Sequence, residues 1–200
     1  MGAFFQSLSR TITAGIVLLI VLVIIVAAAA GGRVSLGDHG WWQFAMRWLH
    51  VTAGVMWIGL LWYFNFVQTP SMPKIPDEQK PAVSKVIAPT ALFWFRWAAM
   101  ATIILGLILA WMAGYLGQAI MLKKPFTTIG LGMWLGAIMW FNVWFVIWPN
   151  QKKALGIVTV APEEKAAAAK RAGMASRINT MLSIPMLYFM VAQSHGGIAF

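Results

Sequence analysis

Histidine is the residue type in this chain with the clearest capacity for metal or redox chemistry, and the chain has three: His39, His50 and His195. Cysteine is absent, which excludes disulfides, thiolate metal sites, iron–sulfur clusters and the C-x-x-C-H attachment of c-type haem. His50 lies inside a long apolar stretch, where an ionisable side chain is costly and usually serves a function. Neutral imidazole is a common axial ligand of haem iron. The sequence therefore predicts that His50 binds haem b.

The neighbours of His50 suit a haem. Gly54 lies one turn further along the same helical face, and its missing side chain would leave room for a flat macrocycle. Arg47 lies about one turn before His50 and would pair with a propionate, because a guanidinium binds a carboxylate at two points. His195 is the natural second ligand of the iron.

Each histidine also has a simpler interpretation that the sequence leaves open. His50 could make an interhelical hydrogen bond to a threonine, a serine or a backbone carbonyl. His195 could be an interfacial residue at the end of its helix, and His39 is interpreted as a loop residue. One of the thirteen methionines could ligate iron instead, although methionine is also common in membrane cores.

Composition identifies the environment in which these residues work. Hydrophobic residues make up 60% of the 200 residues and charged residues 10%, against about 25% charged residues in soluble proteins. Apolar runs of about 20 residues recur, which is the length that crosses the hydrocarbon core of a bilayer. The net charge of +10 lies mostly between these runs, which fits contact with anionic lipid. We expect an all-α integral membrane protein whose partner is the lipid bilayer. We expect no binding of nucleic acid.

The apolar runs predict five transmembrane helices, at about 11–30, 42–67, 92–117, 126–148 and 176–194. The first run is expected to be an anchor helix, because it is longer than a usual signal-peptide core, although its charged start and AAAAGG end also suit a cleaved signal. Five prolines predict a surface loop or a short broken helix at 68–91. A proline followed by two acids predicts a short interfacial helix near 162–173.

Lysine and arginine predict the orientation of the chain, since cytoplasmic segments carry an excess of them. If the N-terminus is cytoplasmic, eleven of the fifteen fall inside, and four fall outside: Arg33, Arg47, Lys123 and Lys124. The prediction is a multi-pass membrane protein with a cytoplasmic N-terminus and its C-terminus on the outer side. All three histidines then lie toward the outer side.

Part of the sequence occurs twice. Met56-Trp57-Ile58-Gly59 and Phe64-Asn65 are matched 77 residues later by Met133-Trp134-Leu135-Gly136 and Phe141-Asn142, and Arg96 with Met100 is matched by Arg177 with Met181. We expect an anchor at 1–32 and a pseudo-symmetric four-helix bundle at 33–200, built from parallel-topology hairpin repeats at about 41–117 and 126–195. The position that matches His50 is Thr127, so one copy alone would hold the histidine site. The asparagines and arginines shared by both copies predict a symmetric interhelical network, with a proton or quinone pathway as the alternative.

Four stretches carry a family resemblance: WLHVTAGVMWIGLLWYFNFVQTPSM (48–72), RWAAMATIILGLILAWMAGY (96–115), GMWLGAIMWFNVWFVIWPNQ (132–151) and ASRINTMLSIPMLYFMVAQSH (175–195). They resemble the membrane domain at the N-terminus of bacterial cytochrome-c-linked urate oxidases, over roughly residues 41–195. The resemblance implies a periplasm-facing redox function with electrons passed to a c-type cytochrome. The sequence ends at Phe200 without C-x-x-C-H, so we expect a stand-alone member whose electron acceptor is a separate subunit.

The leading hypothesis is an inner-membrane redox protein that binds haem b near the periplasmic side and exchanges electrons with a c-type cytochrome or another respiratory partner. One alternative is a non-catalytic accessory subunit of a larger membrane complex. A third hypothesis is oxidation of urate or a related purine with a separate cytochrome c. The sequence leaves open whether the chain is an enzyme and whether it forms a homo-oligomer.

Overall fold

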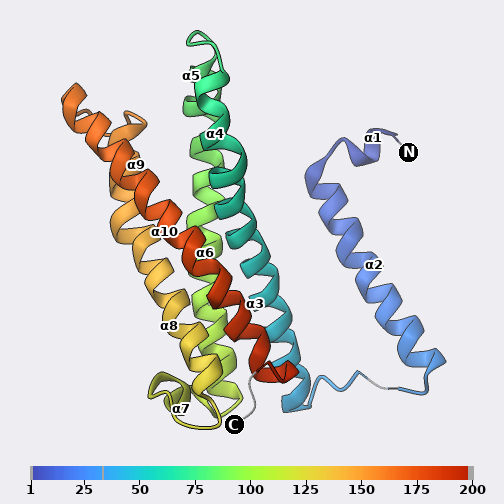
Figure 1. Ribbon diagram of the computed structural model, residues 1–200. Coiled ribbons are helices and arrows are strands. Elements are labelled where there is room, and N and C mark those ends of the chain that lie inside the picture. Colours follow the sequence, from blue (N-terminus) through green and yellow to red (C-terminus); the bar gives the residue numbers. More distant parts are fainter. Residues whose placement is uncertain (1, 33, 198–200) are drawn as a thin grey trace. The chain divides into compact units, whose positions relative to one another are not determined.

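The computed structural model describes residues 2–32 and 34–197, and every regular element in these residues is helical (Figure 1). Arg33, which entered the orientation count, lies outside them. The chain divides into two compact units, Met1–Trp42 and Gln43–Phe200. Each unit is described by itself below.

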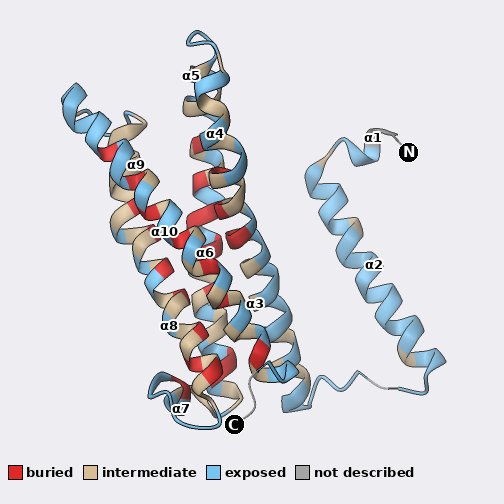
Figure 2. Cartoon of the chain, viewed as in Figure 1, coloured by how far each residue is buried: buried red, intermediate tan, exposed pale blue. Residues whose placement is uncertain are grey.

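The first unit contains α1 (Gly2–Phe5) and the long helix α2 (Leu8–Ala29). The helix α2 is apolar on all sides, and none of its residues, all of which the structure describes, is buried (Figure 2). Its 22 residues are enough to cross a bilayer. Gly31 follows the helix with a φ of 64°, a conformation that glycine adopts without strain and that commonly ends a helix.

Three further helices are long and apolar enough to cross a membrane, so the described residues contain four candidate membrane spans. This supports the prediction of a multi-pass membrane protein. In addition to Leu8–Ala29, these spans are His39–Lys74, Lys80–Met112 and Thr127–Ala154. The first is built from α3 (His39–Trp62), η1 (Tyr63–Gln68), α4 (Thr69–Ser71) and η2 (Met72–Lys74). The second is α5 (Lys80–Ala82), η3 (Val83–Ile87) and α6 (Ala88–Met112), and the third is α8 (Thr127–Phe141), η4 (Asn142–Ile147) and α9 (Trp148–Ala154). The short helix α7 (Leu116–Ile120) lies between α6 and α8.

Wider π-helical turns carry the backbone toward prolines inside these spans. Each of η1, η3 and η4 ends two residues before a proline, namely Pro70, Pro89 and Pro149. A proline has no N–H, and its ring collides with the carbonyl one turn earlier, so a local widening lets the helix continue. Pro185 lies inside another helix without such a segment. Of the two interpretations of 68–91, the broken helix is therefore the one found, and the break is limited to 75–79.

The last helix differs from the prediction. The prediction of a separate interfacial helix near 162–173 is wrong, because α10 runs without a break from Pro162 through the residues of the predicted last span to His195. Gly173, at the predicted junction, costs a helix only about 1 kcal/mol relative to alanine, and the alanines around it favour the helix. Ala168, Ala172 and Ala175 are also buried, which anchors the first half of α10 in the bundle. This helix is not among the four apolar spans of the described residues.

Small residues hold α8 against its neighbours in the second unit, where α10 packs along α8 and α9 (Figure 1). A Cβ atom on Gly132 would lie 3.2 Å from the backbone nitrogen of Met190, so these helices approach closely. Gly136, the expected second residue of this small-residue pair, has no atom within 4 Å of a Cβ position. The tightest position is Gly130, where a Cβ would lie 2.2 Å from the carbonyl oxygen of Ala119 in α7.

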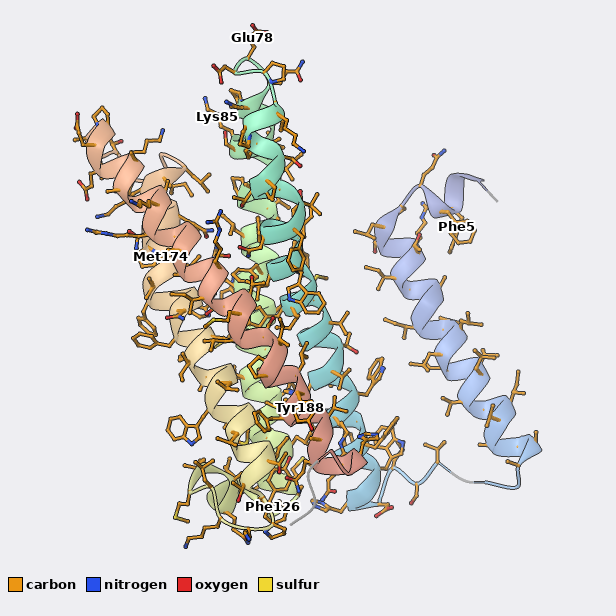
Figure 3. All side chains as sticks on the ribbon, in the orientation of Figure 1. Phe5, Glu78, Lys85, Phe126, Met174 and Tyr188 are labelled. Atoms are coloured by element: carbon orange, nitrogen blue, oxygen red, sulfur yellow. The ribbon has the colours of Figure 1, made fainter. Side chains whose placement is uncertain are left out.

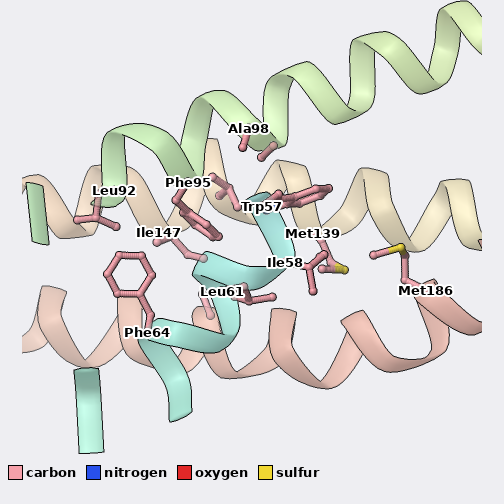
Figure 4. Close-up of a cluster of buried hydrophobic side chains, with 13 residues drawn as sticks. Trp57, Ile58, Leu61, Phe64, Leu92, Phe95, Ala98, Met139, Ile147 and Met186 are labelled. Carbon is pink, nitrogen blue, oxygen red and sulfur yellow. The ribbon is translucent and has the colours of Figure 1, made fainter. Parts of the chain in front are cut away.

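A buried apolar cluster joins α3, α6, α8 and α10, together with the π-helical turns η1 and η4 (Figure 4). Trp57 and Leu61 of α3 and Phe95 of α6 are at most 2% exposed, and Phe64 meets Phe95 edge-on with ring centroids 5.9 Å apart. Met139 of α8 is fully buried in the same cluster. The core therefore sits at mid-length of the bundle.

The glycines of α8 make a matched pair for a stability test. We expect Gly130→Ala to destabilise the protein by about 1–3 kcal/mol, because the added methyl meets a backbone oxygen that cannot move alone. Gly136→Ala should be neutral or stabilising by up to about 1 kcal/mol, since the site is open and alanine favours the helix. Thermal unfolding of the detergent-solubilised protein measures both, and equal effects of the two substitutions would contradict the α7–α8 contact.

Candidate functional site

His50 is held by the helix opposite its own. It lies on the inward face of α3, half-buried, with its Nδ1 atom 2.9 Å from the carbonyl oxygen of Thr102 in α6. Gly106, one turn beyond Thr102, leaves the space for this contact, because a Cβ there would lie 2.8 Å from Cε1 of the imidazole. The missing side chain thus lets the ring reach a main-chain carbonyl of a neighbouring membrane helix.

This hydrogen bond fixes the chemistry of the ring. A carbonyl oxygen can only accept, so Nδ1 carries the hydrogen and donates it. In the neutral imidazole, Nε2 is then left with its lone pair free to bind a metal. Histidine ligands of metals typically donate their other ring N–H to a carbonyl or carboxylate in this way. The arrangement is also the interhelical hydrogen bond that was the simpler interpretation of His50, and the two roles are compatible.

Gly54 and Arg47 occupy different surroundings around His50. Gly54 faces α6, where a Cβ would make ordinary contact at 3.8 Å with Cγ2 of Thr102. Arg47 is exposed, and its charge acts on Tyr115, which follows α6 and stacks on Phe126 at 5.0 Å. Burial raises the pKa of the Tyr115 phenol, and the positive charge of Arg47 opposes that rise. Arg47 therefore stands at the rim of the α3–α6 pair with its guanidinium available to an anion.

His195 ends α10 in an exposed position, and its Nδ1 atom lies 3.1 Å from the carbonyl oxygen of Val191 on the same helix. The indole of Trp62 donates to Ser183 Oγ at 3.0 Å, which sets the register between the antiparallel helices α3 and α10. His50 and His195 each lie twelve residues from this bond toward the same end, about 18 Å along the helices. The two imidazoles are therefore at a similar depth.

The described residues contain no group of three or more His, Cys, Asp or Glu side chains that could hold a metal ion. His39 is the first residue of α3 rather than a loop residue, and it belongs to the first unit.

The asparagines shared by the two repeats do link helices. Asn65 Nδ2 donates to Ser176 Oγ at 2.8 Å, and Asn142 Nδ2 donates to Oδ1 of the fully buried Asn179 at 2.9 Å. The arginines do not share this symmetry. Arg96 is 8% exposed and lies over an indole ring, whereas Arg177 is exposed. The structural interpretation of the asparagines is supported, and the prediction of one symmetric network that includes both arginines is wrong.

Sequence reasoning missed Thr102 and Gly106, although they position His50 most directly. Thr102 contributes its main-chain carbonyl, which carries no residue-specific signal. Gly106 was visible as a glycine within an apolar helix, but only the pairing of α3 with α6 shows what its missing side chain admits.

A family comparison covers the C-terminal part of the chain. Residues 123–200 match the urate oxidase N-terminal family. This confirms the resemblance over α8, η4, α9 and α10. Of the predicted site residues, His195 lies inside the matched region, while Arg47, His50 and Gly54 lie before it. No curated protein and no solved structure matches the chain.

Gly106 and Gly54 provide a direct test of the site geometry. We expect Gly106→Ala to destabilise the protein by about 1–3 kcal/mol, because its methyl group collides with a ring that the Thr102 carbonyl holds in place. Gly54→Ala adds a methyl at ordinary contact distance and should change stability by less than about 1 kcal/mol. Thermal unfolding of both variants measures the difference, and a harmless Gly106→Ala would show that His50 does not sit against α6.

Proposed function

We propose that the chain is an inner-membrane redox protein that binds haem b through Nε2 of His50. The observation that carries this proposal is the hydrogen bond from His50 Nδ1 to the Thr102 carbonyl, because it leaves Nε2 free and fixes the plane of the ring. Gly106 admits the imidazole to this position, and Gly54 lies against Thr102 of the same helix. The surroundings of His50 are therefore compatible with its binding haem iron through Nε2.

The other predicted residues have defined tasks in this proposal. His195 would supply the second axial nitrogen, since it lies at a similar depth and its Nε2 is also free. Arg47 would hold a propionate at the rim of the α3–α6 pair. Haem b, when bound, supplies a one-electron iron couple. A c-type cytochrome or another respiratory partner would then exchange electrons with the chain.

The proposed topology has five spans, with the N-terminus in the cytoplasm and the C-terminus in the periplasm. The four candidate spans support it, and the second half of α10 would be the fifth. This half packs along α8, so it needs less apolar surface than a helix that faces lipid on all sides. The placement puts His50 and His195 toward the periplasm, where c-type cytochromes act.

Oxidation of urate or a related purine is the second candidate, and the family match over residues 123–200 favours it. Such a reaction would transfer electrons from the purine to a separate cytochrome c. Urate-dependent reduction of added cytochrome c by the purified protein tests it. A haem-containing protein without this activity would retain the electron-transfer role alone.

A reduced-minus-oxidised optical spectrum tests the haem proposal. We expect protein purified from its native membrane to show a b-type α band that is lost in His50→Ala, because the iron loses its principal ligand. His195→Ala should retain haem with an altered band, since one axial nitrogen remains.

His39→Ala is the matched control, and its spectrum should equal that of the wild-type protein. Wild-type protein that is folded and free of haem would overturn the proposal. The accessory-subunit hypothesis, in which the chain packs into a larger membrane complex, would then take its place.

Labelling of single introduced cysteines tests the fifth span. The sequence has no native cysteine, so the label reports only the introduced position. Gln79→Cys lies in the turn between two spans, and Ser194→Cys lies near the end of α10; both positions are exposed. We expect a membrane-impermeant maleimide to label Ser194→Cys from the periplasm and Gln79→Cys from the cytoplasm, because three spans separate them. Labelling of both cysteines from the same side would mean that α10 does not cross the membrane.

A further inference from the structure

Arg96 is a buried cation inside a candidate membrane span, outside the histidine site. It is 8% exposed, and its guanidinium carbon lies 3.4 Å from the ring centroid of Trp148 in α9. One guanidinium nitrogen, NH1, is buried and has no hydrogen-bond partner among the described residues. The indole stabilises the positive charge through its ring face but accepts no hydrogen bond from NH1. The charge of Arg96 therefore has an aromatic partner, but its NH1 donor has no hydrogen-bond acceptor among the described residues.

Two glutamines add unpartnered buried atoms on the elements next to Arg96. The Oε1 atoms of Gln68 and Gln151 are buried and make no hydrogen bond to any described residue. Gln151 is three residues after Trp148, on the same face of its helix. Gln68 is one turn after Phe64, whose ring meets Phe95, the neighbour of Arg96 (Figure 4). Gln151 thus shares α9 with Trp148, which lies on Arg96, and Gln68 shares η1 with Phe64, which lies on the residue beside Arg96.

No carboxylate in residues 2–32 and 34–197 pairs with Arg96. The two ion pairs of these residues join Lys80 to Asp77 and Lys153 to Glu164, and the other described acids are exposed. Lys152 lies 5.7 Å from the same Trp148 ring and adds positive charge. Lys85 stands at the same end of the bundle, opposite the end that carries Phe126 and Tyr188 (Figure 3). An unpaired buried charge is strongly unfavourable, so an anion from outside the described residues would stabilise Arg96.

We propose that Arg96, Gln68 and Gln151 form a phosphate-binding site between η1, α6 and α9. A phosphate oxygen would accept from NH1 of Arg96, as guanidinium groups bind oxyanions. The oxygen and nitrogen of a glutamine amide exchange places by rotation of the amide, so both glutamines can present N–H donors to the same anion. The phosphate belongs either to an anionic phospholipid of the adjoining leaflet or to free phosphate in solution. The site uses no haem, so it stands apart from the proposed redox function.

Thermal unfolding in defined lipid tests the site. Purified protein is titrated in neutral phosphatidylcholine nanodiscs with phosphatidylglycerol in one arm and inorganic phosphate in the other. We expect one ligand to raise the unfolding midpoint of the wild-type protein. Arg96→Gln should bind that ligand about 10- to 100-fold more weakly, because it loses a charge-assisted hydrogen bond.

Arg177→Gln is the matched control, since it removes an exposed arginine from the corresponding position of the second repeat and should bind as the wild type does. Gln151→Ala keeps the cation and should weaken binding about three- to tenfold, which tests the site even if Arg96→Gln fails to fold. A response to phosphatidylglycerol alone assigns the lipid headgroup, and a response to inorganic phosphate in neutral nanodiscs assigns the free oxyanion. No response, or equal loss in Arg96→Gln and Arg177→Gln, overturns the proposal.

Discussion

The absence of water in a bilayer core is the constraint on which the structure depends. Backbone and side-chain polar groups there must find partners within the protein. Helices satisfy the backbone, and the π-helical turns before Pro70, Pro89 and Pro149 let three spans continue toward residues that lack an N–H. The same constraint explains the contact of His50 with Thr102, because a membrane imidazole needs an acceptor and a main-chain carbonyl is at hand. Unpartnered buried groups are therefore informative, and the clearest one in the described residues belongs to Arg96.

Two kinds of packing divide the second unit. The helices α8 and α10 meet through glycine, alanine and buried asparagine, so their backbones come close and interhelical hydrogen bonds hold them. The helices α3 and α6 meet mostly through large side chains such as Trp57 and Phe95. The imidazole of His50 lies directly against Gly106 of α6. The α8–α10 pair lies in the region that matches the urate oxidase N-terminal family. The α3–α6 pair carries the histidine on which the redox proposal rests.

The two repeats share a scaffold but differ in chemistry. Both α3 and α8 continue into a π-helical turn and then a proline, and both place an asparagine near that turn, with a partner on α10. The imidazole is confined to α3, and burial distinguishes Arg96 from Arg177 although the sequence places them at matching positions. The common framework thus carries an imidazole near one end and a buried cation nearer the other, each in one copy only.

Hydropathy was enough to predict an all-α membrane protein and five spans, of which the structure confirms four as apolar helices, because span length is a property of a single segment. It also marked His50 as the residue of interest, because the cost of a buried imidazole is likewise a property of one segment. The resemblance to the urate oxidase N-terminal family, confirmed over residues 123–200, was also predicted from the sequence. The continuity of α10 was not, since it depends on alanines packed in the bundle as well as on the tolerance of a helix for Gly173. Thr102, Gly106 and the contrast between Arg96 and Arg177 emerged only from the tertiary structure. Each depends on which helix faces which, and at what register, and those relations are set by packing between segments far apart in the chain.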